Sequence, residues 1–391
     1  MDRFASLGLV LLASSLLAAS APAQEGVLNF GPEEIIKAKG KEIVVPGYSV
    51  TSFEDWNNDH LKDLIVGEGG GAAPGKIRVY LNRGTESDPC FVDYFYVESW
   101  GQDLTCVPGE RLGCFPRVVH WDADNRKDLL VGLADGRVVA FVNIGTDNDP
   151  VFDAGTEVRV GPSWATVTLN VGADATPVLP DWNNDGMLDI VAGGYDGGIH
   201  YYYNCGCGGW APPHFSFSTY DGELVWDASV LLRVPSGSSS PVVMDLDGNG
   251  KKDLLIGNAN GQILFYRNNW ADIAPGFVGY SVVHSAGRPI DLPGSLCSRP
   301  FVCHWAGSAH WDLLVGYGDG KIRLYRGLKA GDFNGNGTLD ADDLTALTKA
   351  LDKPVPAGGS PYDLNKDGVV NLLDLRLFAD LWLAEYGADQ K

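Results

Sequence analysis

The stretch DWNNDHLKDLIVG at 55–67 is the first of five related phrases in the chain. The others are HWDADNRKDLLVG at 120–132, DWNNDGMLDIVAG at 181–193, DLDGNGKKDLLIG at 245–257 and HWAGSAHWDLLVG at 304–316. Each phrase joins a polar, mostly acidic half to an apolar half, and the aspartates at the junction recur every 59 to 65 residues: Asp63, Asp128, Asp189, Asp253 and Asp312. A period of this size indicates an array of like structural units.

Each phrase is followed by signals for further β-strands. Turns with the hairpin-forming pairs Asp-Gly or Asn-Gly follow four of the apolar runs, at 135–136, 196–197, 260–261 and 319–320. Aromatic and β-branched runs come next, at 77–81, 138–142, 199–203, 263–266 and 322–325. A further strand is expected after these runs, for example at 150–152 and 214–217. About four strands per unit predict an all-β, five-bladed β-propeller over residues 27–329.

The ends of this region favour a closed ring. The last repeat stops after its third strand, and residues 27–30 resemble the missing fourth one. An N-terminal strand that completes the last blade would remove an open sheet edge. The alternative architecture is an open solenoid.

The pattern changes at Gly331. DFNGNGTLDADD at 332–343 and DLNKDGVVNLLD at 363–374 are each followed by leucines at helical spacing, over 344–351 and 375–383. Two loop–helix copies predict a small all-α, calcium-binding domain over residues 330–386.

Three of the five phrases carry oxygen-bearing side chains at alternate positions, as a calcium loop requires. The predicted ligands, counting the main-chain carbonyl at position seven, are Asp55, Asn57, Asp59, Leu61 and Asp63; Asp181, Asn183, Asp185, Met187 and Asp189; and Asp245, Asp247, Asn249, Lys251 and Asp253. The alternative is that these residues form Asx turns that only join strands.

The other two phrases depart from this pattern. His120 stands at position one of the second phrase, so Asp122, Asp124 and Asp128 are only a weak metal set; His304 and Ala306 leave the fifth phrase without enough oxygens. We expect His120 and His304 to hydrogen-bond their loops in place of an ion, with catalysis or transition-metal binding as the alternative. Trp56, Trp121, Trp182 and Trp305 share the second loop position and are expected to be structural.

The C-terminal loops carry a fuller twelve-position pattern with glycine at position six. The predicted ligands are Asp332, Asn334, Asn336, Thr338, Asp340 and Asp343 in the first loop, and Asp363, Asn365, Asp367, Val369, Asn371 and Asp374 in the second. The sequence thus predicts about three Ca²⁺ ions in the propeller and two in the C-terminal domain.

The N-terminal residues and the net charge indicate where the protein functions and which partners it is expected to have. Residues 1–23 read as a secretory signal peptide, with Arg3, an apolar run and Ala21-Pro22-Ala23, which predicts a secreted, extracellular or cell-surface protein without a membrane span. The net charge of −21, with no basic stripe, argues against nucleic acid as a partner.

The chain has seven cysteines. Cys106 and Cys114 flank a turn and are the favoured disulfide. Cys297–Cys303 is a weaker pairing, since Cys303 could be a packed thiol.

The repeated phrase resembles the FG-GAP or VCBS repeat of integrin-α-type propellers, over about 27–329. That resemblance implies a propeller with calcium in the loops that begin at Asp55, Asp181 and Asp245, and implies little about function.

Residues 331–386 resemble a type I dockerin. This second resemblance implies a cohesin-bearing scaffold or cell-surface protein as partner, commonly in polysaccharide-degrading complexes, with specificity at Ala341-Asp342 and Leu372-Leu373. The two pairs differ, which argues against two interchangeable orientations, unless Leu372 and Leu373 belong to the core.

Two functions compete for the propeller. The first is a non-catalytic carbohydrate- or protein-binding module, with a polysaccharide as candidate ligand, and its candidate residues are Trp100, Arg111, Trp164, Trp226, Arg233 and Arg288. The alternative is that most of these tryptophans pack between blades. The second function is a polysaccharide lyase or glycoside hydrolase, for which Tyr195, His200, His120 and Arg117 are candidates that no spacing singles out. The absence of a recognised catalytic motif favours the first.

Overall fold

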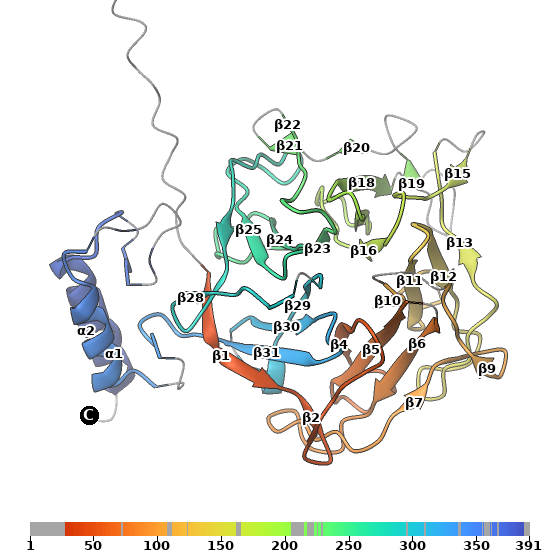
Figure 1. The fold of residues 1–391 in the computed structure, drawn as a ribbon, viewed down its shortest axis with the longest axis horizontal. Coiled ribbons are helices and arrows are strands. Elements are labelled where there is room, and N and C mark those ends of the chain that lie inside the picture. Colours follow the sequence, from red (N-terminus) through yellow and green to blue (C-terminus); the bar gives the residue numbers. More distant parts are fainter. Residues whose placement is uncertain are drawn as a thin grey trace, which may run out of the picture.

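The computed structural model of the chain describes residues 28–71, 73–107, 112–122, 124–161, 166–204, 230–294, 296–308, 310–334, 338–353, 355, 360, 362–365 and 367–386, and the backbone of 215–216, 223–224 and 226–227. Five antiparallel sheets stand around a common centre, and two helices lie beside them (Figure 1). The five-bladed propeller is therefore confirmed.

Each blade begins with a strand at the centre of the ring and proceeds outward by antiparallel pairing. Blade 1 holds β4 (Val50–Glu54), β5 (Asp63–Gly70), β6 (Ala73–Tyr80) and β7 (Phe95–Tyr96). Blade 2 holds β10 (Cys114–Val119), β11 (Asp128–Leu133), β12 (Val138–Phe141) and β13 (Thr156–Glu157). Blade 3 holds β16 (Thr176–Val178), β17 (Ile190–Gly193) and β18 (Ile199–Asn204), with β19 (Phe215–Ser216) and β20 (Glu223–Leu224) outside them. Blade 4 holds β23 (Ser240–Met244), β24 (Asp253–Gly257), β25 (Ile263–Tyr266) and β26 (Ser281–Val282).

Blade 5 is assembled from both ends of the propeller. Its strands are β29 (Arg299–Cys303), β30 (Asp312–Gly316), β31 (Ile322–Gly327) and β1 (Asn29–Ile35). The N-terminal strand β1 pairs antiparallel with β31 and lies beside it in Figure 1. An ion pair of 3.3 Å joins Arg326 to Glu34 across this seam. The ring is closed, so the open-solenoid alternative is wrong.

Short hairpins follow the outer strands, and the sequence did not reveal them. They are β2–β3 (Lys37–Ala38, Lys41–Glu42), β8–β9 (Glu98–Ser99, Gln102–Asp103), β14–β15 (Arg159–Val160, Val167–Thr168), β21–β22 (Trp226–Asp227, Val230–Leu231) and β27–β28 (His284–Ser285, Arg288–Pro289). The strand expected at 150–152 is also wrong: Phe152 makes only isolated bridges, to Asn143 and to Ser99, and β13 at 156–157 pairs with β12 instead.

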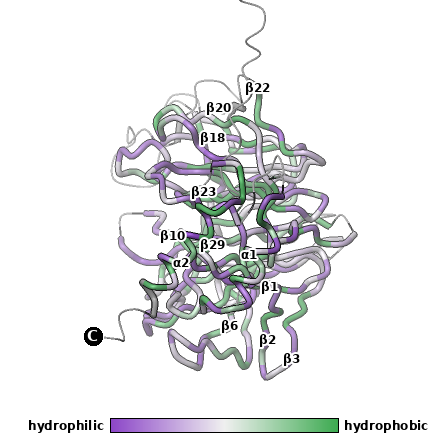
Figure 2. The backbone as a smooth tube through the Cα atoms, turned by 90° about the vertical axis from the view of Figure 1, so that its left-hand side faces the viewer, coloured by the Kyte–Doolittle hydropathy of each residue, from purple (hydrophilic) through white to green (hydrophobic). Residues whose placement is uncertain are grey.

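The core of the propeller lies between its blades. Buried side chains form a separate cluster between each blade and the next. Hydrophobic and hydrophilic segments alternate along the chain (Figure 2). The four tryptophans at loop position two each contribute to one of these clusters and are at most 6% exposed: Trp56, Trp121, Trp182 and Trp305. The expectation that they are structural is confirmed.

Glycines let neighbouring blades approach closely. A Cβ at Gly132 of β11 would lie 2.1 Å from the carbonyl oxygen of Ala175, just before the innermost strand of blade 3. Gly67, Gly257 and Gly316 stand in the same position in their blades, and a Cβ there would meet the next blade at 2.1–2.2 Å. The glycine that ends each apolar phrase is therefore a packing requirement.

The C-terminal domain is built on α1 (Ala341–Ala350) and α2 (Leu372–Tyr386), with a 3-10 turn, η1 (Trp305–Gly307), as the remaining helical element of the described chain. Asp340 caps α1, with its side chain bonded to backbone N–H groups and Asp343 bonded back to the N–H of Asp340. Phe333, Leu347 and Phe378 form the centre of a small core. Within the described chain, neither helix is long and apolar enough to traverse a bilayer.

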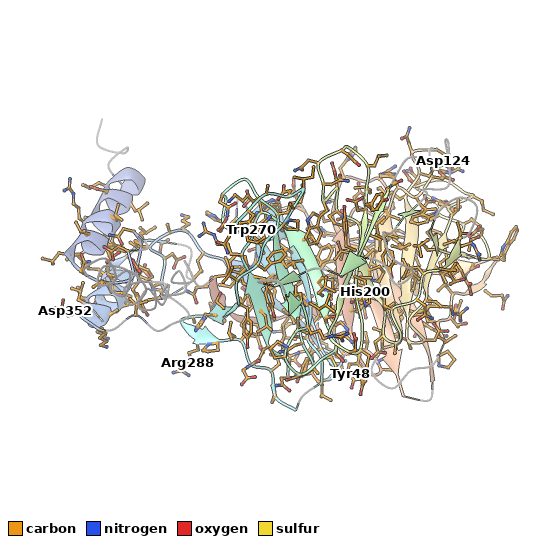
Figure 3. All side chains as sticks on the ribbon, turned by 90° about the horizontal axis from the view of Figure 1, so that it is seen from above. Tyr48, Asp124, His200, Trp270, Arg288 and Asp352 are labelled. Atoms are coloured by element: carbon orange, nitrogen blue, oxygen red, sulfur yellow. A yellow bond between two sulfur atoms is a disulfide. The ribbon has the colours of Figure 1, made fainter. Side chains whose placement is uncertain are left out.

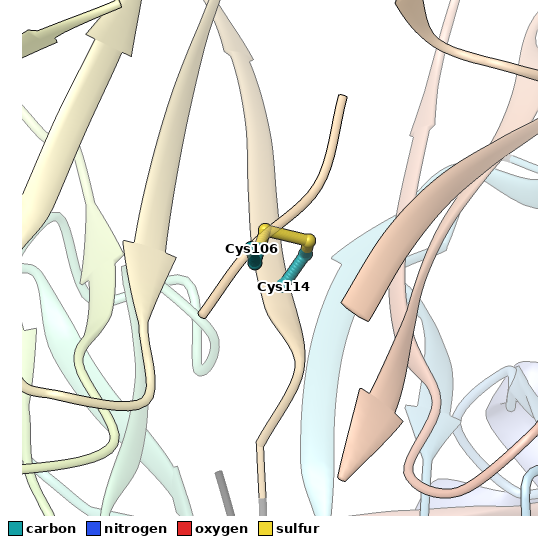
Figure 4. The surroundings of a disulfide bond; sticks show 2 residues. All are labelled: Cys106 and Cys114. Carbon is teal, nitrogen blue, oxygen red and sulfur yellow. A yellow bond between two sulfur atoms is a disulfide. The ribbon is translucent and has the colours of Figure 1, made fainter. Parts of the chain in front are cut away.

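A disulfide joins Cys106 to Cys114, with a Cα–Cα distance of 5.6 Å (Figure 4). Cys297 and Cys303 are both buried and free, so the weaker pairing of these two is wrong. Burial raises the pKa of the Cys303 thiol, as expected for a packed thiol.

Candidate calcium loops

The aspartate at position nine anchors the loop in every blade. Its Oδ2 accepts a hydrogen bond from the backbone N–H at position two, and its Oδ1 accepts one from a backbone N–H at or just after the end of the third strand. In blade 1 these bonds join Asp63 to Trp56 at 2.8 Å and to Asn82 at 2.7 Å. The same pair of bonds is made by Asp128, Asp189, Asp253 and Asp312. Position nine therefore joins the loop to the sheet whether or not the loop carries other acids.

The side chains at positions one, three and five fold back over the loop. In blade 4, Asp245 accepts bonds from the N–H groups of Asn249 and Gly250 at 3.0 and 2.8 Å. Asp247 accepts from Asn249 at 3.1 Å, and Asn249 accepts from the N–H of Lys251 at 2.9 Å. Blade 3 repeats these bonds with Asp181, Asn183, Asp185 and Met187, and blade 1 repeats most of them with Asp55, Asn57, Asp59 and Leu61. Successive Asx turns thus gather the polar side chains on one side of the backbone.

The backbone conformation of these three loops differs from that of the loop in blade 5. Positions four and six have positive φ in blade 1 (Asn58, His60), blade 3 (Asn184, Gly186) and blade 4 (Gly248, Gly250). In blade 5 the positive φ values fall at positions three and four, Ala306 and Gly307. The fifth loop therefore follows a different path, consistent with its lack of oxygen side chains.

The arrangement fits a hard cation. Oxygens of Asp245, Asp247 and Asp253 all lie within 4.8 Å of one another, as do those of Asp122, Asp124 and Asp128. Asp55 Oδ1 is buried and accepts no hydrogen bond. Carboxylates and carbonyls at this density are the ligands that Ca²⁺ takes.

Burial of the anchoring carboxylates is electrostatically costly without a cation. Desolvation raises the pKa of Asp253 to about 7 and that of Asp63 to about 6, although backbone N–H bonds oppose the shift. Neighbouring aspartates raise both values further. A divalent cation would offset these terms and favour the charged form.

The histidines at position one bond within their own loops. His120 Nδ1 lies 2.9 Å from the carbonyl oxygen of Arg126, and His304 Nδ1 lies 3.1 Å from that of His310. His304 also stacks on Trp311, with ring centroids 3.9 Å apart. Both histidines therefore bond within their own loops, as expected.

The C-terminal loops repeat the same geometry. Asp363 accepts bonds from Asp367 and Gly368 at 3.2 and 2.8 Å, and Asp374 accepts from Leu364 at 2.7 Å and Asn371 at 2.8 Å. In the same loop, Asn365 accepts from Asp367 and the N–H of Val369 bonds to Asp367.

In the first C-terminal loop, Asp343 accepts from Phe333 at 2.8 Å, Asn334 at 3.0 Å and Asp340 at 3.0 Å. Thr338 and the largely buried Asp332 belong to the described part of this loop. Asn336 lies outside the described residues.

Sequence reasoning missed a clasp between loops of adjacent blades. Asp147 accepts bonds from the N–H of Lys127 at 2.7 Å and from Asn58 Nδ2 at 3.0 Å, which joins blade 2 to the loop of blade 1. Asp272 makes the equivalent bonds to Lys252 at 2.7 Å and to Asn184 at 2.9 Å between blades 4 and 3. The sequence contains a pattern that could have revealed these contacts. Where a phrase has asparagine at position four, as at Asn58 and Asn184, the next phrase has lysine at position eight. An aspartate then follows the anchoring aspartate of that next phrase by 19 residues.

Among the predicted ligand-binding residues, the three whose side chains the structure describes belong to different parts of the propeller. Trp100 is 65% exposed at the tip of β8–β9, so it does not pack between blades. Arg233 forms an ion pair with Asp196 in blade 3, and Arg288 lies on β28, at the end of the propeller that faces the helices (Figure 3). Arg111 and Trp164 lie outside the described residues, as does the side chain of Trp226.

The candidate catalytic side chains are also dispersed. Tyr195 and His200 belong to blade 3, where Tyr195 is 49% exposed and the His200 ring stacks on Tyr202. Arg117 lies buried in β10 at the centre of the ring. His120 belongs to the loop of blade 2, so the four do not form one catalytic group among the described residues.

Comparison with solved structures returns matches at low identity and low TM-score. The Tc holotoxin pore of Photorhabdus luminescens with the mutation TccC3-D651A has 10% identity and a TM-score of 0.32, with 80% of this chain and 15% of that chain covered. BBS1N in complex with ARL6DN has 12% identity, a TM-score of 0.37 and coverage of 79% and 99%. The GH43_1 enzyme of Xanthomonas citri complexed with xylotriose has 9% identity, a TM-score of 0.41 and coverage of 75% and 88%. These likenesses carry no functional argument.

Family comparison identifies two segments. Residues 181–256 match the FG-GAP-like repeat, and residues 330–379 match the type I dockerin domain. Among curated proteins nothing matches the chain. Type I dockerin domains bind calcium and have cohesins as partners. This chain therefore carries an FG-GAP-like repeat within a five-bladed propeller and a type I dockerin domain after it.

Proposed function

We propose that this chain is a secreted, non-catalytic binding protein. Its propeller presents a surface to a carbohydrate or a protein, and its dockerin domain tethers that surface through cohesin to an extracellular polysaccharide-processing assembly. The calcium ions expected in both parts act as structural cofactors, held by the loop residues described above. The signal-like residues 1–23 and the Cys106–Cys114 disulfide support an extracellular setting.

One observation carries the tethering proposal: the small C-terminal domain leaves leucines in solvent. Leu372 is 72% exposed, Leu383 66% and Leu373 54%, although the same domain buries Leu347 fully. Exposed apolar side chains on so small a domain are typical of a protein interface. The alternative that Leu372 and Leu373 belong to the core is wrong.

The two loop–helix copies offer different contacts to a partner. Leu372 and Leu373 begin α2, whereas Ala341 and Asp342 stand at the equivalent positions of α1. An apolar pair and a small–acidic pair cannot make the same contacts with one cohesin surface. We therefore propose a single preferred docking orientation, in which the α2 end supplies the apolar contact.

Cohesin capture tests the tether. The full chain is passed over immobilised type I cohesins in millimolar calcium and in excess EDTA, and binding is expected only in calcium. Leu372→Ala/Leu373→Ala should weaken binding tenfold or more, which corresponds to about 1.4 kcal/mol. The matched control is Leu188→Ala, which truncates an exposed leucine of the propeller. Binding that persists in EDTA, or equal losses in both variants, would contradict the tether.

The binding role of the propeller needs a separate test, because only three of the predicted ligand-binding side chains lie in the described part of the chain. The full chain is applied to a glycan array in calcium, and selective binding to one class of polysaccharide supports the proposal. Trp100→Ala is expected to reduce that binding if its exposed ring stacks on the sugar. Release of unsaturated uronic products or reducing sugars from a bound polysaccharide would instead establish a catalytic propeller.

A further inference from the structure

The buried side chain of Arg117 contacts the innermost strands of neighbouring blades. Arg117 belongs to β10, the innermost strand of blade 2, yet its Nη1 donates to the carbonyl oxygen of Thr51 at 3.1 Å and to Ser52 Oγ at 3.0 Å in blade 1. Its guanidinium carbon also lies 5.3 Å from the centre of the Phe301 ring in blade 5. One side chain therefore contacts three blades where their innermost strands meet, and it is only 6% exposed.

Hydrogen bonds from the guanidinium of Arg117 involve only its Nη1 group. Nη1 has three acceptors, since the carbonyl oxygen of Pro116 lies 2.9 Å away in addition to the two groups in blade 1. Nε and Nη2 are buried and have no hydrogen-bond partner. Those two nitrogens form the side of the guanidinium that grips an oxoanion with two parallel N–H···O bonds. The bonds to Nη1 hold the plane of this open edge fixed.

Among the described residues, no carboxylate forms an ion pair with Arg117. The carboxylate whose charge acts on it, that of Glu54, accepts a hydrogen bond from Lys62 Nζ at 2.7 Å. Desolvation lowers the pKa of Arg117 to about 9. On the same face of β29 as Phe301, two residues before it, Arg299 adds a second guanidinium that is 1% exposed. The buried positive charge of Arg117 is unfavourable unless an anion compensates it.

We propose that the propeller axis is a binding site for a small oxoanion, held on the Nε–Nη2 edge of Arg117. The ligand class is a carboxylate or an inorganic tetrahedral oxoanion, because either presents two oxygens to the fork. The near-complete burial of both arginines limits the ligand to a small ion and excludes a sugar residue. The site is separate from the calcium loops and from the dockerin surface.

Thermal unfolding with defined anions tests the site. The full chain is dialysed into a sulfonate buffer, with calcium supplied as the sulfonate salt, and sodium formate, sulfate or chloride is added at constant ionic strength. A saturating oxoanion is expected to raise the unfolding midpoint of the propeller by roughly 3–8 °C. The stronger of formate and sulfate identifies the ligand as a carboxylate or a tetrahedral oxoanion. Chloride offers a single acceptor atom and should shift the midpoint less.

Two variants test whether the anion-dependent shift of the unfolding midpoint depends on Arg117. Arg117→Lys keeps the charge without the planar fork, and Arg117→Met removes both; each should lose most of the anion-dependent shift. Arg288→Met, which removes an exposed arginine from β28, should retain the whole shift. If Arg117→Met does not fold, Arg117→Lys still decides the matter. An equal shift in wild type and Arg117→Lys, an equal effect of chloride, or no shift at all would overturn the proposal.

Discussion

Both carboxylate oxygens of Asp312 are occupied by backbone N–H groups, at 2.8 Å from Trp305 and 2.6 Å from Gly327, in a loop with no other acid. Asp253 makes the same bonds in a loop that also holds Asp245 and Asp247. At the scale of the residue, the anchoring aspartate therefore has a structural role that is independent of calcium. The residues at positions one, three and five, such as Asp245 and Asp247, have no acidic counterpart in the loop of blade 5, so we expect them to depend on the ion.

This division predicts different responses to chelation. Asp312→Ala leaves two N–H groups without their acceptor and should lower the free energy of unfolding by about 3 kcal/mol, equally in calcium and in EDTA. Asp245→Ala should cost about 2–3 kcal/mol in saturating calcium and much less in EDTA, because it removes an ion contact. Urea denaturation of both variants in both buffers measures the difference. A calcium-dependent loss in Asp312→Ala would show that blade 5 binds an ion after all.

At the scale of the element, the seam between β1 and β31 decides whether the ring is closed. Phe30 of β1 is 5% exposed and packs in the cluster shared by blades 4 and 5. Phe30→Ala should lower stability by about 3–5 kcal/mol through the lost contacts and the cavity. The matched variant Phe95→Ala, at a ring 42% exposed on β7, should cost about 1 kcal/mol or less. Equal losses would mean that β1 is not needed to hold blade 5.

Strand β27, which pairs with β1, contains a histidine, His284, whose protonation depends on pH. Burial lowers the pKa of His284, whose Nδ1 lies 2.8 Å from the carbonyl oxygen of Val282. Below the unfolded value of about 6.5 the unfolded chain binds more protons at this residue than the folded chain does, so stability falls as the pH falls through that value. His284→Gln should remove part of the loss of stability between pH 7 and pH 5. His310→Gln, at an exposed site, should not; equal slopes in the two variants would contradict this role.

Elements with a strong local pattern could be predicted from the sequence, and weakly patterned ones could not. The inner strands follow from runs such as 128–131, and the turns follow from glycines with positive φ such as Gly136. The outer strand of blade 2 has two residues, and Phe152 resembled a strand because it is apolar and buried in the loop before it. The predicted calcium ligands were chosen from their spacing along one loop, and the structure brings several of their oxygens together. The roles of Arg117 and Asp147 depend on neighbouring blades, which a local pattern does not describe.

At the scale of the whole molecule, the two parts should depend on calcium to different degrees. The propeller has five interblade clusters, whereas the dockerin core rests on Phe333, Leu347, Phe378 and a few neighbours. A domain of about sixty residues buries little surface and is marginal without a bound metal.

Excess EDTA should therefore unfold α1 and α2 while the propeller remains folded. Circular dichroism at 222 nm should lose the helical signal, and the main thermal transition should remain, shifted to lower temperature. Asp363→Ala should show the same loss of helicity in calcium. Helicity that is unchanged by EDTA would contradict a calcium-dependent dockerin fold.

The pairing of β1 with β31 also sets an order of events during synthesis. Tyr325 bonds to Glu33 across a sequence separation of 292 residues, so the first strand to leave the ribosome must wait for nearly the last one. Until then β1 has an unpaired edge that could recruit another nascent chain. A growing polypeptide can stack its early blades, but it cannot complete the circle until translation of the propeller has ended.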